Sequence, residues 1–450
     1  MEKIKTCKSN RSAAVCSFQN AVDLQAKLLK QKILTAAGSI PETGKKWYVS
    51  AHNAGGDGST PEAPLGGLEA LENQFDHIQP GDAVLFERGG IFRGSLITQS
   101  GVYYGAYGTG EKPRIYGSAQ NYAGIPWKAA GENIWEIDYT FHEDVGLIVV
   151  DDGRHIGYKR YQLAELKENF DFTCDHENGY KLYLYLKGDP SSFQSIEIGT
   201  NQNILWITEN THDVTVENLH LQYTGAHGIR ALNGVKNIAV KNCEISYLGG
   251  SYIPGYKEGT TRYGNGVEFW QGCENVTVEH CWIHDIYDSG ISHQGNGDYV
   301  AKNLRFFSNL IEYCGMGSIE YWLWNTKDGK KCRAENVTYA DNIMRFAGYG
   351  FGGVQRPDKI SAHILSNGKN HNKFEHFKIE RNIFDQSSCY LVEISSMENT
   401  FPALNGNTYI QKRGKALGMY AESGNVVFDD SVQSIIQNEW GDVSAKVYCI

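Results

Sequence analysis

A short pattern occurs six times in this chain: an alternating apolar pair, then Asn or His, then an apolar residue. The copies are VTVENL ending at Leu219, IAVKNC at Cys243, VTVEHC at Cys281, LRFFSNL at Leu310, VTYADNI at Ile343 and FKIERNI at Ile383. Apolar residues at i and i+2 have the period of a strand with one buried face. A unit this short cannot bury a core alone and must stack on its neighbours, so the repeat predicts a parallel β-helix.

A second short strand follows several copies, usually after a glycine. These strands are GIR at 228–230, GVE at 266–268, GIS at 290–292 and SIE at 318–320. The copies recur at roughly 24 to 40 residues, which leaves room for two or three short strands in each turn of a solenoid. We expect an all-β chain built mainly from such turns.

The repeat also predicts which residues point inward. We expect the final apolar residues of the six copies to form one inward column: Leu219, Cys243, Cys281, Leu310, Ile343 and Ile383. The preceding residues are expected to form a side-chain ladder at a tight bend, because Asn tolerates left-handed backbone and satisfies turn amides: Asn218, Asn242, His280, Asn309, Asn342 and Asn382.

Composition narrows the possible partners and compartments. The net charge of −10 argues against nucleic acid, and no apolar stretch is long enough to span a membrane. The ten cysteines are scattered without zinc-type spacing, so we expect reduced thiols and no metal site. The first residues lack an apolar signal core, which favours a cytoplasmic protein, or a secreted one if a leader has been removed.

The chain divides into five expected regions. Residues 1–46 form a helical extension that could cap the open end of the first coil, and residues 47–120 form the first β-helix coils. Residues 121–200 break the repeat with aromatic and β-branched strands, which indicates an inserted or wrapping β subdomain. The main repeats with the groove occupy 201–397, and 398–450 form a C-terminal cap.

The segments YVSAHNAGGDGSTPEAPLGGLEAL, PGDAVLFERGGIFRG and YGAYGTGEKPRIYGS resemble the opening of right-handed parallel β-helix carbohydrate-active enzymes. This pectate-lyase-like superfamily includes glycoside hydrolases and polysaccharide lyases. The resemblance, which with the repeats covers most of residues 47–400, implies a right-handed β-helix and a carbohydrate substrate. It also implies a groove along one sheet, bordered by unequal loops such as those at 251–265, 320–336 and 352–376. We expect a monomer or a small homo-oligomer.

Aligning the second strands on Ile229, Val267, Ile291, Ile319 and Val392 places an outward column of polar residues beside them: Arg230, Glu268, Ser292, Glu320 and Glu393. The next outward positions are Trp270, Gln294 and Trp322. Aromatic rings beside acids are suited to sugars, which present CH groups for stacking and hydroxyls for hydrogen bonds.

Hydrolysis of a glycosidic bond requires two carboxyl groups of unequal pKa. Glu268 and Glu320 lie two coils apart, which separates their backbones by about 9.6 Å. Asp288 stands in the turn HDIYDSGIS and could reach the groove beside Glu268, or could simply cap that turn. The candidate catalytic residues are therefore Asp288 and Glu268, which we favour, with Glu320 as the third candidate, although spacing alone does not choose between the possible pairs.

Other polar residues near the groove are candidates for substrate binding. They are Arg230, His227, Arg262, Tyr263, Trp270, His293, Gln294, Trp322 and Glu393, with His284 and Asp285 expected to be structural. The preferred hypothesis is a glycoside hydrolase without a cofactor.

The two alternatives are a polysaccharide lyase and a glycan-binding β-helix without activity. A lyase would use a base among Arg230, Arg262, Arg356 and Lys359, with calcium held by the acids. It is disfavoured because the predicted face carries more acids than bases.

Overall fold

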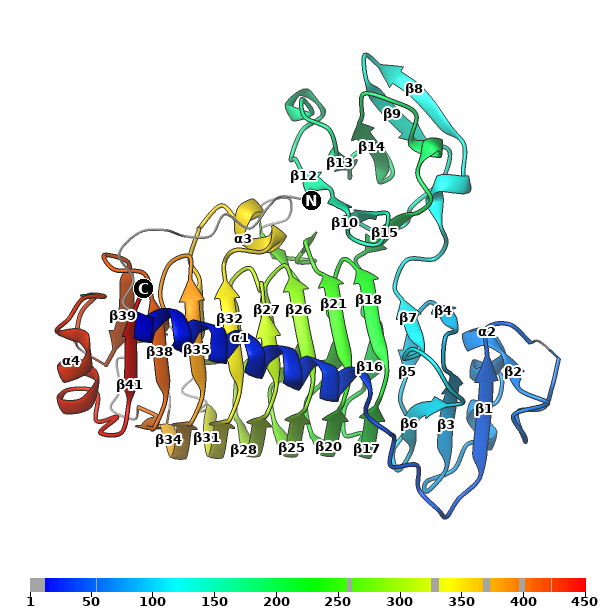
Figure 1. The fold of residues 1–450 in the computed structure, drawn as a ribbon. Coiled ribbons are helices and arrows are strands. Elements are labelled where there is room, and N and C mark those ends of the chain that lie inside the picture. The colour runs from blue at the N-terminus through cyan, green and yellow to red at the C-terminus, as the bar shows by residue number, and fades with distance from the viewer. Residues whose placement is uncertain are drawn as a thin grey trace.

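The computed structural model describes residues 13–450 apart from 54, 257–260, 325–331, 367–372, 396–400 and 422. Within these residues three long sheets run side by side along one axis (Figure 1). Nearly all neighbouring strands within them pair in parallel, one turn after another. The predicted parallel β-helix is therefore confirmed.

Sheet A contains, in order, β2 (Leu65–Gly66), β1 (Lys46–Ser50), β3 (Ala83–Glu87), β6 (Tyr103–Tyr107), β17 (His212–Glu217), β20 (Val235–Lys241), β25 (Cys273–Glu279), β28 (Tyr299–Phe307), β31 (Cys332–Ala340), β34 (Lys373–Glu380) and β37 (Ala403–Asn405). Sheet B contains β4 (Ile91–Arg93), β7 (Arg114–Tyr116), β18 (His220–Thr224), β21 (Glu244–Leu248), β26 (Trp282–Ile286), β29 (Leu310–Glu312), β32 (Ile343–Ala347), β35 (Ile383–Ser387), β38 (Thr408–Gln411) and β41 (Lys446–Cys449). Sheet C contains β5 (Leu96–Ile97), β16 (Leu205–Ile207), β19 (Ile229–Ala231), β24 (Val267–Trp270), β27 (Ser289–Asn296), β30 (Gly317–Trp324), β33 (Ala362–Ser366), β36 (Val392–Ile394), β39 (Ala416–Tyr420) and β40 (Val426–Val427).

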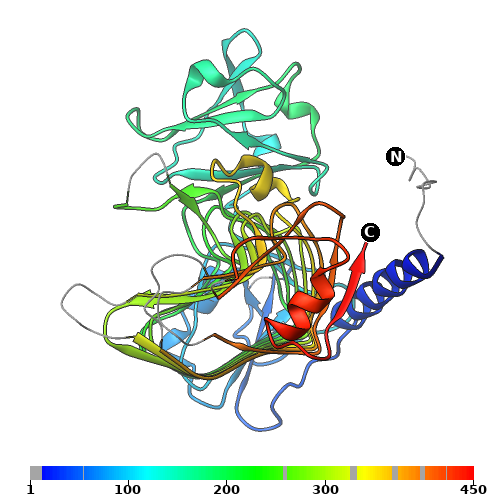
Figure 2. The same ribbon diagram turned by 90° about the vertical axis from the view of Figure 1, so that its left-hand side faces the viewer.

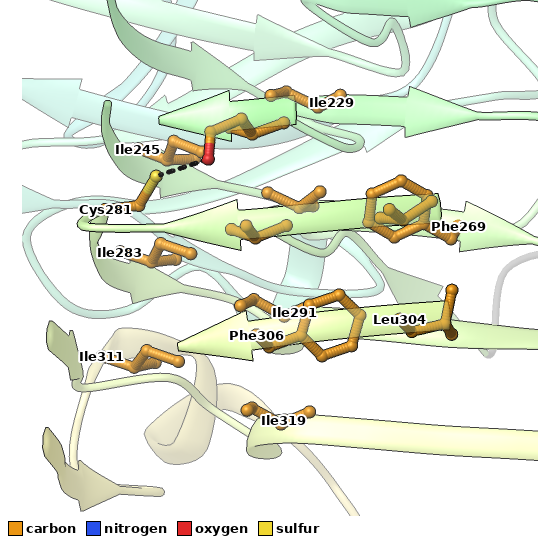
Figure 3. Packing of buried hydrophobic residues seen from close by; sticks show 14 of the residues in the cluster. Ile229, Ile245, Phe269, Cys281, Ile283, Ile291, Leu304, Phe306, Ile311 and Ile319 are labelled. Carbon is orange, nitrogen blue, oxygen red and sulfur yellow. Dashed lines mark hydrogen bonds between the residues drawn. The ribbon is translucent and has the colours of Figure 1, made fainter. Parts of the chain in front are cut away.

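The core consists of columns of apolar residues that repeat from coil to coil. On sheet A, Val276 pairs with Leu304 and Leu304 with Val337, and all three are fully buried. Figure 3 shows this stacking, with Ile283 and Ile311 from sheet B and Ile291 and Ile319 from sheet C facing the same interior. The period-two alternation seen in the sequence thus fixes which side of each strand faces inward.

The expected inward column at the end of each copy is correct only for the first three copies. Cys243 and Cys281 are fully buried in the core, as is Leu219. Leu310, however, pairs with Trp282 rather than with Cys281, so it lies on the outer face of sheet B. The last three copies contain one extra residue before their final apolar position, and a shift of one residue moves a side chain to the opposite face. Ile343 and Ile383 follow Leu310 on this outer face.

The extra residue places asparagine inside the last coils. The amide of Asn309 donates to the side-chain oxygen of Asn342 at 3.0 Å, and that of Asn342 donates to Asn382 at 2.9 Å. Asn382 donates in turn to Asn407, which donates to Asp442. The predicted side-chain ladder is therefore present in these coils.

The corresponding residues of the first three copies occupy the bend instead. Asn218, Asn242 and His280 have φ values of 60°, 50° and 50°, which is left-handed backbone that Asn adopts readily. They stand where Ser308, Asp341 and Arg381 stand in the later copies, with φ near the same value.

The N-terminal extension contains helix α1 (Ala13–Leu34). We expected this extension to cover the open end of the first coil, but the helix lies elsewhere. Figures 1 and 2 both show it along the outside of sheet B. Ala26 and Ile33 pack against Leu310 and Ile343, the apolar residues that the extra residue turns outward. No helix in the described ranges is long and apolar enough to cross a membrane.

Residues 122–198 form a hydrophobic cluster separate from the core of the coils. Its strands are β8 (Trp127–Gly131), β9 (Ile134–Ile137), β10 (Val145–Val150), β11 (His155–Ile156), β12 (Tyr158–Lys159), β13 (Asp171–Asp175), β14 (Lys181–Tyr185) and β15 (Ile196–Thr200). This inserted part stands to one side of the coils in Figure 2. Within this inserted part, Lys159 and Asp144 form a buried ion pair. Asp144 also accepts a hydrogen bond from the backbone N–H of Tyr252, which connects the inserted part to the short hairpin of β22 (Ser251–Tyr252) and β23 (Arg262–Tyr263).

The two ends of the coil stack are closed by short helices. Helix α2 (Gly67–Glu72) buries Leu71 against the first coil, and α4 (Val432–Asn438) buries Val432 and Ile436 at the other end. Between the last repeat and α4, strands β37, β38 and β39 add a further coil to sheets A, B and C. The first part of the expected cap, residues 398–450, therefore forms a further turn of the β-helix.

Candidate active site

Strand pairing on sheet C brings the predicted polar column together. In order along the axis the column is Trp206, Arg230, Glu268, Ser292, Glu320, Leu365 and Glu393. The adjacent residues Ile229, Val267, Ile291, Ile319, Ile364 and Val392 belong to the core, so the polar column faces the other way. Sequence alignment missed Trp206 and Leu365, and Leu365 separates Glu393 from Glu320.

The neighbouring column on the same face contains Trp270, Gln294 and Trp322, as predicted. Nε2 of Gln294 lies 3.3 Å from Oε2 of Glu268 and 3.4 Å from Oε1 of Glu320. These two carboxyl oxygens can therefore be at most 6.7 Å apart, the sum of the two distances. One amide thus links two acids that are separated by 52 positions in the sequence.

Glu268 is buried and held by hydrogen bonds. Its side chain accepts a hydrogen bond from Nδ2 of Asn265 at 2.7 Å, and the residue is only 2% exposed. Burial raises the pKa of the Glu268 carboxyl to about 7, although Asn265, Gln294 and the nearby Arg230 favour its charged form. Asn265 also accepts from the backbone N–H of Ser289 and so fixes the strand on which the next coil begins.

Glu320 has an even higher affinity for its proton. It accepts hydrogen bonds from Oγ of Ser292 at 2.9 Å and from Nε1 of Trp322 at 3.2 Å, and it is 2% exposed. Burial, together with the negative charges of Asp288 and Glu268, raises the pKa of Glu320 to about 8. Two acids with raised pKa values therefore share one site, a feature common among catalytic carboxyls.

Asp288 occupies the turn between β26 and β27, close enough for its charge to act on Glu320. Its carboxylate forms an ion pair with Arg356, whose Nη2 also binds Asp358 at 2.7 Å. Burial raises the pKa of Asp288 although Arg356 opposes this shift. The Asp288 side chain therefore pairs with an arginine just beyond helix α3 (Phe351–Gln355), and its electrostatic effect falls on Glu320.

Two of the predicted substrate-binding residues have structural positions instead. His293 is 1% exposed and points into the core, where its Nε2 binds the hydroxyl of Tyr339. Arg262 is 6% exposed, and it donates from Nε to the carbonyl of Gly250 and from Nη2 to Oε1 of Gln355. His293 follows the outward Ser292 directly, so strict alternation already places it on the inner face.

His227 and Tyr263 lie beside the column and brace the chain around it. Nδ1 of His227 accepts a hydrogen bond from the backbone of Asn265 at 3.0 Å. The hydroxyl of Tyr263 donates to Oδ1 of Asn201 at 2.7 Å. The rings of His227 and Tyr263 meet edge to face. These contacts hold the segment that carries Asn265, and Asn265 in turn binds Glu268, so both residues help to position Glu268.

Glu393 resembles the central acids but stands apart from them. Burial raises the pKa of its carboxyl to about 7.

No cluster of three or more His, Cys, Asp or Glu residues arranged to hold a metal ion occurs in the part of the chain that the structure describes. Parts of the three expected loops, at 257–260, 325–331 and 367–372, lie outside that part.

Comparison with solved structures finds several carbohydrate-active proteins at low identity. A protein described as "Glycoside hydrolase" is 9% identical, with coverage of 84% of this chain and 95% of that one and a TM-score of 0.48. A GH136 lacto-N-biosidase from Eubacterium ramulus is 14% identical, covering 97% and 71% at a TM-score of 0.40. A pectate lyase, Pel9A, is 12% identical, covering 86% and 74% at 0.41.

No curated protein matches the chain in sequence. Residues 192–338 do match a family model described as "Right handed beta helix region". Together with the strand pairing of the three sheets, this match confirms that the chain has the right-handed parallel β-helix fold that its sequence resembles.

Proposed function

We propose that this protein is a glycoside hydrolase that uses Glu268 and Glu320 as its pair of catalytic carboxyls. The observation that supports this most directly is the Gln294 side chain, which bridges the two acids on the outer face of sheet C. Both acids are buried with raised pKa values, and tryptophans stand beside them. Asp288 tunes the pair through its charge on Glu320.

The unequal environments of the two acids assign their roles. Glu320 retains its proton to the higher pH, so it protonates the glycosidic oxygen as the leaving group departs. Glu268 loses its proton first, and its carboxylate attacks the anomeric carbon to form a glycosyl ester. Glu320, now ionised, takes a proton from a water molecule whose oxygen bonds to the anomeric carbon. The ester bond to Glu268 breaks at the same time, which releases the sugar and restores both residues. The two protons leave in coupled steps that belong to the pair.

The separation of the acids is compatible with retention of anomeric configuration, which is the outcome we propose. Retaining enzymes place their carboxyl groups about 5–5.5 Å apart and inverting enzymes about 6.5–9.5 Å apart. The bridged oxygens are at most 6.7 Å apart, a limit that contains the retaining distance and also the lower part of the inverting range. The backbone separation of two coils is larger, but both side chains lean toward Gln294.

Trp270 and Trp322 are suited to hold the sugar across this pair. Both are partly exposed and lie one on each side of Gln294 along the sheet. A pyranose ring stacked on either indole would present its hydroxyls toward the central acids. Trp322 also donates to Glu320, so a bound sugar and the acid are positioned by the same side chain.

A glycan panel tests the proposal through two signals measured together. Hydrolysis releases reducing ends without ultraviolet absorbance, whereas a lyase also produces an unsaturated uronate that absorbs. We expect the first signal alone, its loss in Glu268→Gln and in Glu320→Gln, and a first product of the same anomeric configuration as the substrate by NMR. Absorbance together with cleavage would identify a lyase, and binding without either signal would identify a glycan-binding protein.

A further inference from the structure

A cavity of about 450 Å³ lies at the end of the polar column nearest the first coils. Trp206 and Ile97, which pair with each other on sheet C, line it together with Phe75 from the first coil. Glu143, from the inserted part of the chain, and Gln202 also line it. Three regions that are distant in sequence therefore build one hollow on the same face as Glu268.

The cavity combines an apolar surface with polar side chains. Ile97 is 44% exposed and Trp206 is partly exposed, so both offer a surface to a ligand. Glu143, Asn201 and Gln202 line the same cavity with carboxyl and amide groups. Oε2 of Glu143 has no hydrogen-bond partner among the described residues, and a rotation of this side chain would turn it toward a ligand hydroxyl.

Its position matches the course of a glycan chain along the sheet. Trp206 lies three coils from Ser292, the midpoint of the catalytic pair, which corresponds to about 14 Å along the axis. One pyranose unit advances a glycan by about the spacing of one coil. A chain cleaved between Glu268 and Glu320 would therefore place its third ring from the scissile bond over Trp206.

The charges around the cavity distinguish neutral sugars from acidic ones. Glu143 and Glu72 both line it, and the carboxyl of Glu143 binds Gln202 at 3.4 Å through its other oxygen. Arg230 lies over the Trp206 ring, with its guanidinium carbon 5.6 Å from the ring centre. Two acids against one arginine disfavour a uronate carboxylate and suit the hydroxyls of a neutral sugar.

We propose that this cavity is a distal subsite for a neutral sugar unit, in which Trp206 stacks with the ring and Glu143 and Gln202 bind its hydroxyls. The proposal rests on the proposed hydrolase function, since it takes the substrate to be a glycan that crosses the catalytic pair. It assigns to the inserted part of the chain a direct role in substrate binding. Affinity should then rise when the glycan becomes long enough to reach Trp206.

The test measures binding by calorimetry and cleavage separately, over disaccharides to hexasaccharides prepared from xylan, mannan and galactan, with galacturonate oligomers for comparison. The variants are Trp206→Ala, Trp206→Phe and Glu143→Gln. Glu136→Gln is the matched control, because Glu136 lies in the same inserted part and pairs with Lys181 away from the cavity. Circular dichroism verifies that each variant is folded.

We expect wild-type affinity for a neutral series to rise with length, and Trp206→Ala to lower affinity for the longer members by about tenfold. Trp206→Phe should restore most of this loss, Glu143→Gln should weaken the same members, and Glu136→Gln should match wild type. Length-dependent binding that requires Trp206 without cleavage would reject the hydrolase and keep the subsite. Cleavage with the same length profile in Trp206→Ala, or preferential binding of galacturonate, would overturn the subsite alone. Absence of binding to every series would overturn both.

Discussion

The outer faces of sheets B and C are built by the same coils, yet they carry opposite chemistry. On sheet B the outward residues Leu310 and Ile343 are apolar, and helix α1 covers them. On sheet C, Glu320 lies on the same coil as Leu310 and accepts a hydrogen bond from Ser292 of the neighbouring coil, so this part of the face is an acidic site. The coil requires only its inward columns, so each outward face is free to serve stability or function.

The two faces also contribute to stability with opposite sign. Burying apolar side chains under α1 stabilises the fold by roughly 25 cal/mol for each Å² removed from water. Burying Glu268 and Glu320 is unfavourable to their charged forms, as the raised pKa values of both carboxyls show. The difference separates substitutions that should affect folding from those that should affect turnover.

The largest expected effect is on the acidic face. Glu320→Gln and Glu268→Gln should each lower turnover by about 10²- to 10⁴-fold, because each removes a proton donor or a nucleophile. The amide removes a buried charge, so the free energy of unfolding at neutral pH should be unchanged or higher. Initial rates of reducing-sugar release and urea unfolding measure the two quantities. Glu393→Gln, on the same column but beyond Leu365, is the control and should retain most activity. A large loss of stability with normal turnover would reverse the comparison.

The corresponding substitution on the apolar face is Ile33→Ala in α1. Ile33 is fully buried against sheet B, so its truncation should weaken docking of the helix by about 2–5 kcal/mol. Turnover by the folded protein should stay at the wild-type level. Hydrogen exchange of the α1 amides reports the docking free energy. Leu28→Ala, at a residue 55% exposed on the same helix, should have almost no effect. Equal exchange in both variants would contradict the packing assigned to α1.

The pH dependence of stability should differ between the faces. The folded-state pKa of Glu268, about 7, lies above its ordinary value of 4.5, so the folded protein binds this proton more tightly than the unfolded chain does. This contribution is complete below about pH 4.5 and is lost as the pH rises through about 7, at a cost on the order of 3 kcal/mol. Urea unfolding of wild type and of the double variant Glu268→Gln/Glu320→Gln, at about pH 5 and about pH 8, measures this loss. An equal change in the free energy of unfolding between the two pH values in both proteins would show that the two acids do not cause this loss.

The smallest effect concerns the ionic contact of α1. Asp23 pairs with Arg345 of sheet B, but its side chain is 53% exposed. Solvent screens such a pair, so Asp23→Ala should change the free energy of unfolding by less than about 1 kcal/mol. A loss as large as that of Ile33→Ala would mean that charge, rather than apolar burial, holds the helix to the sheet. Urea unfolding at low and high salt separates these contributions.

The sequence predicted the coils and the acidic column because both follow from a period of two and from glycine-led strands. The repeat pattern is misleading where one residue changes the face: the copies that end at Leu310, Ile343 and Ile383 are one residue longer than the others, and this difference in length turns their last residue outward. His293 was misplaced for the same reason. The rule that placed Ser292 outward assigns its neighbour to the core.

Contacts between distant segments could not be read from the repeat. The bridge through Gln294 depends on the direction in which two glutamate side chains lean, and the pairing of Asp288 with Arg356 joins two connections of unrelated length. Glu143 reaches the end of the column through an inserted segment whose strands share no pattern with the coils. Such contacts follow from packing in three dimensions, which local periodicity does not encode.

Helix α1 constrains the order in which this solenoid can assemble. Phe18, near the start of the chain, stacks on Tyr448 in the final strand, and Gln19 binds Asp385 in β35. During synthesis the helix leaves the ribosome before the surface on which it rests exists, so it can dock only after the later coils have formed. Once docked, it connects successive turns, and separation of the last turns from the stack would also break contacts of the helix.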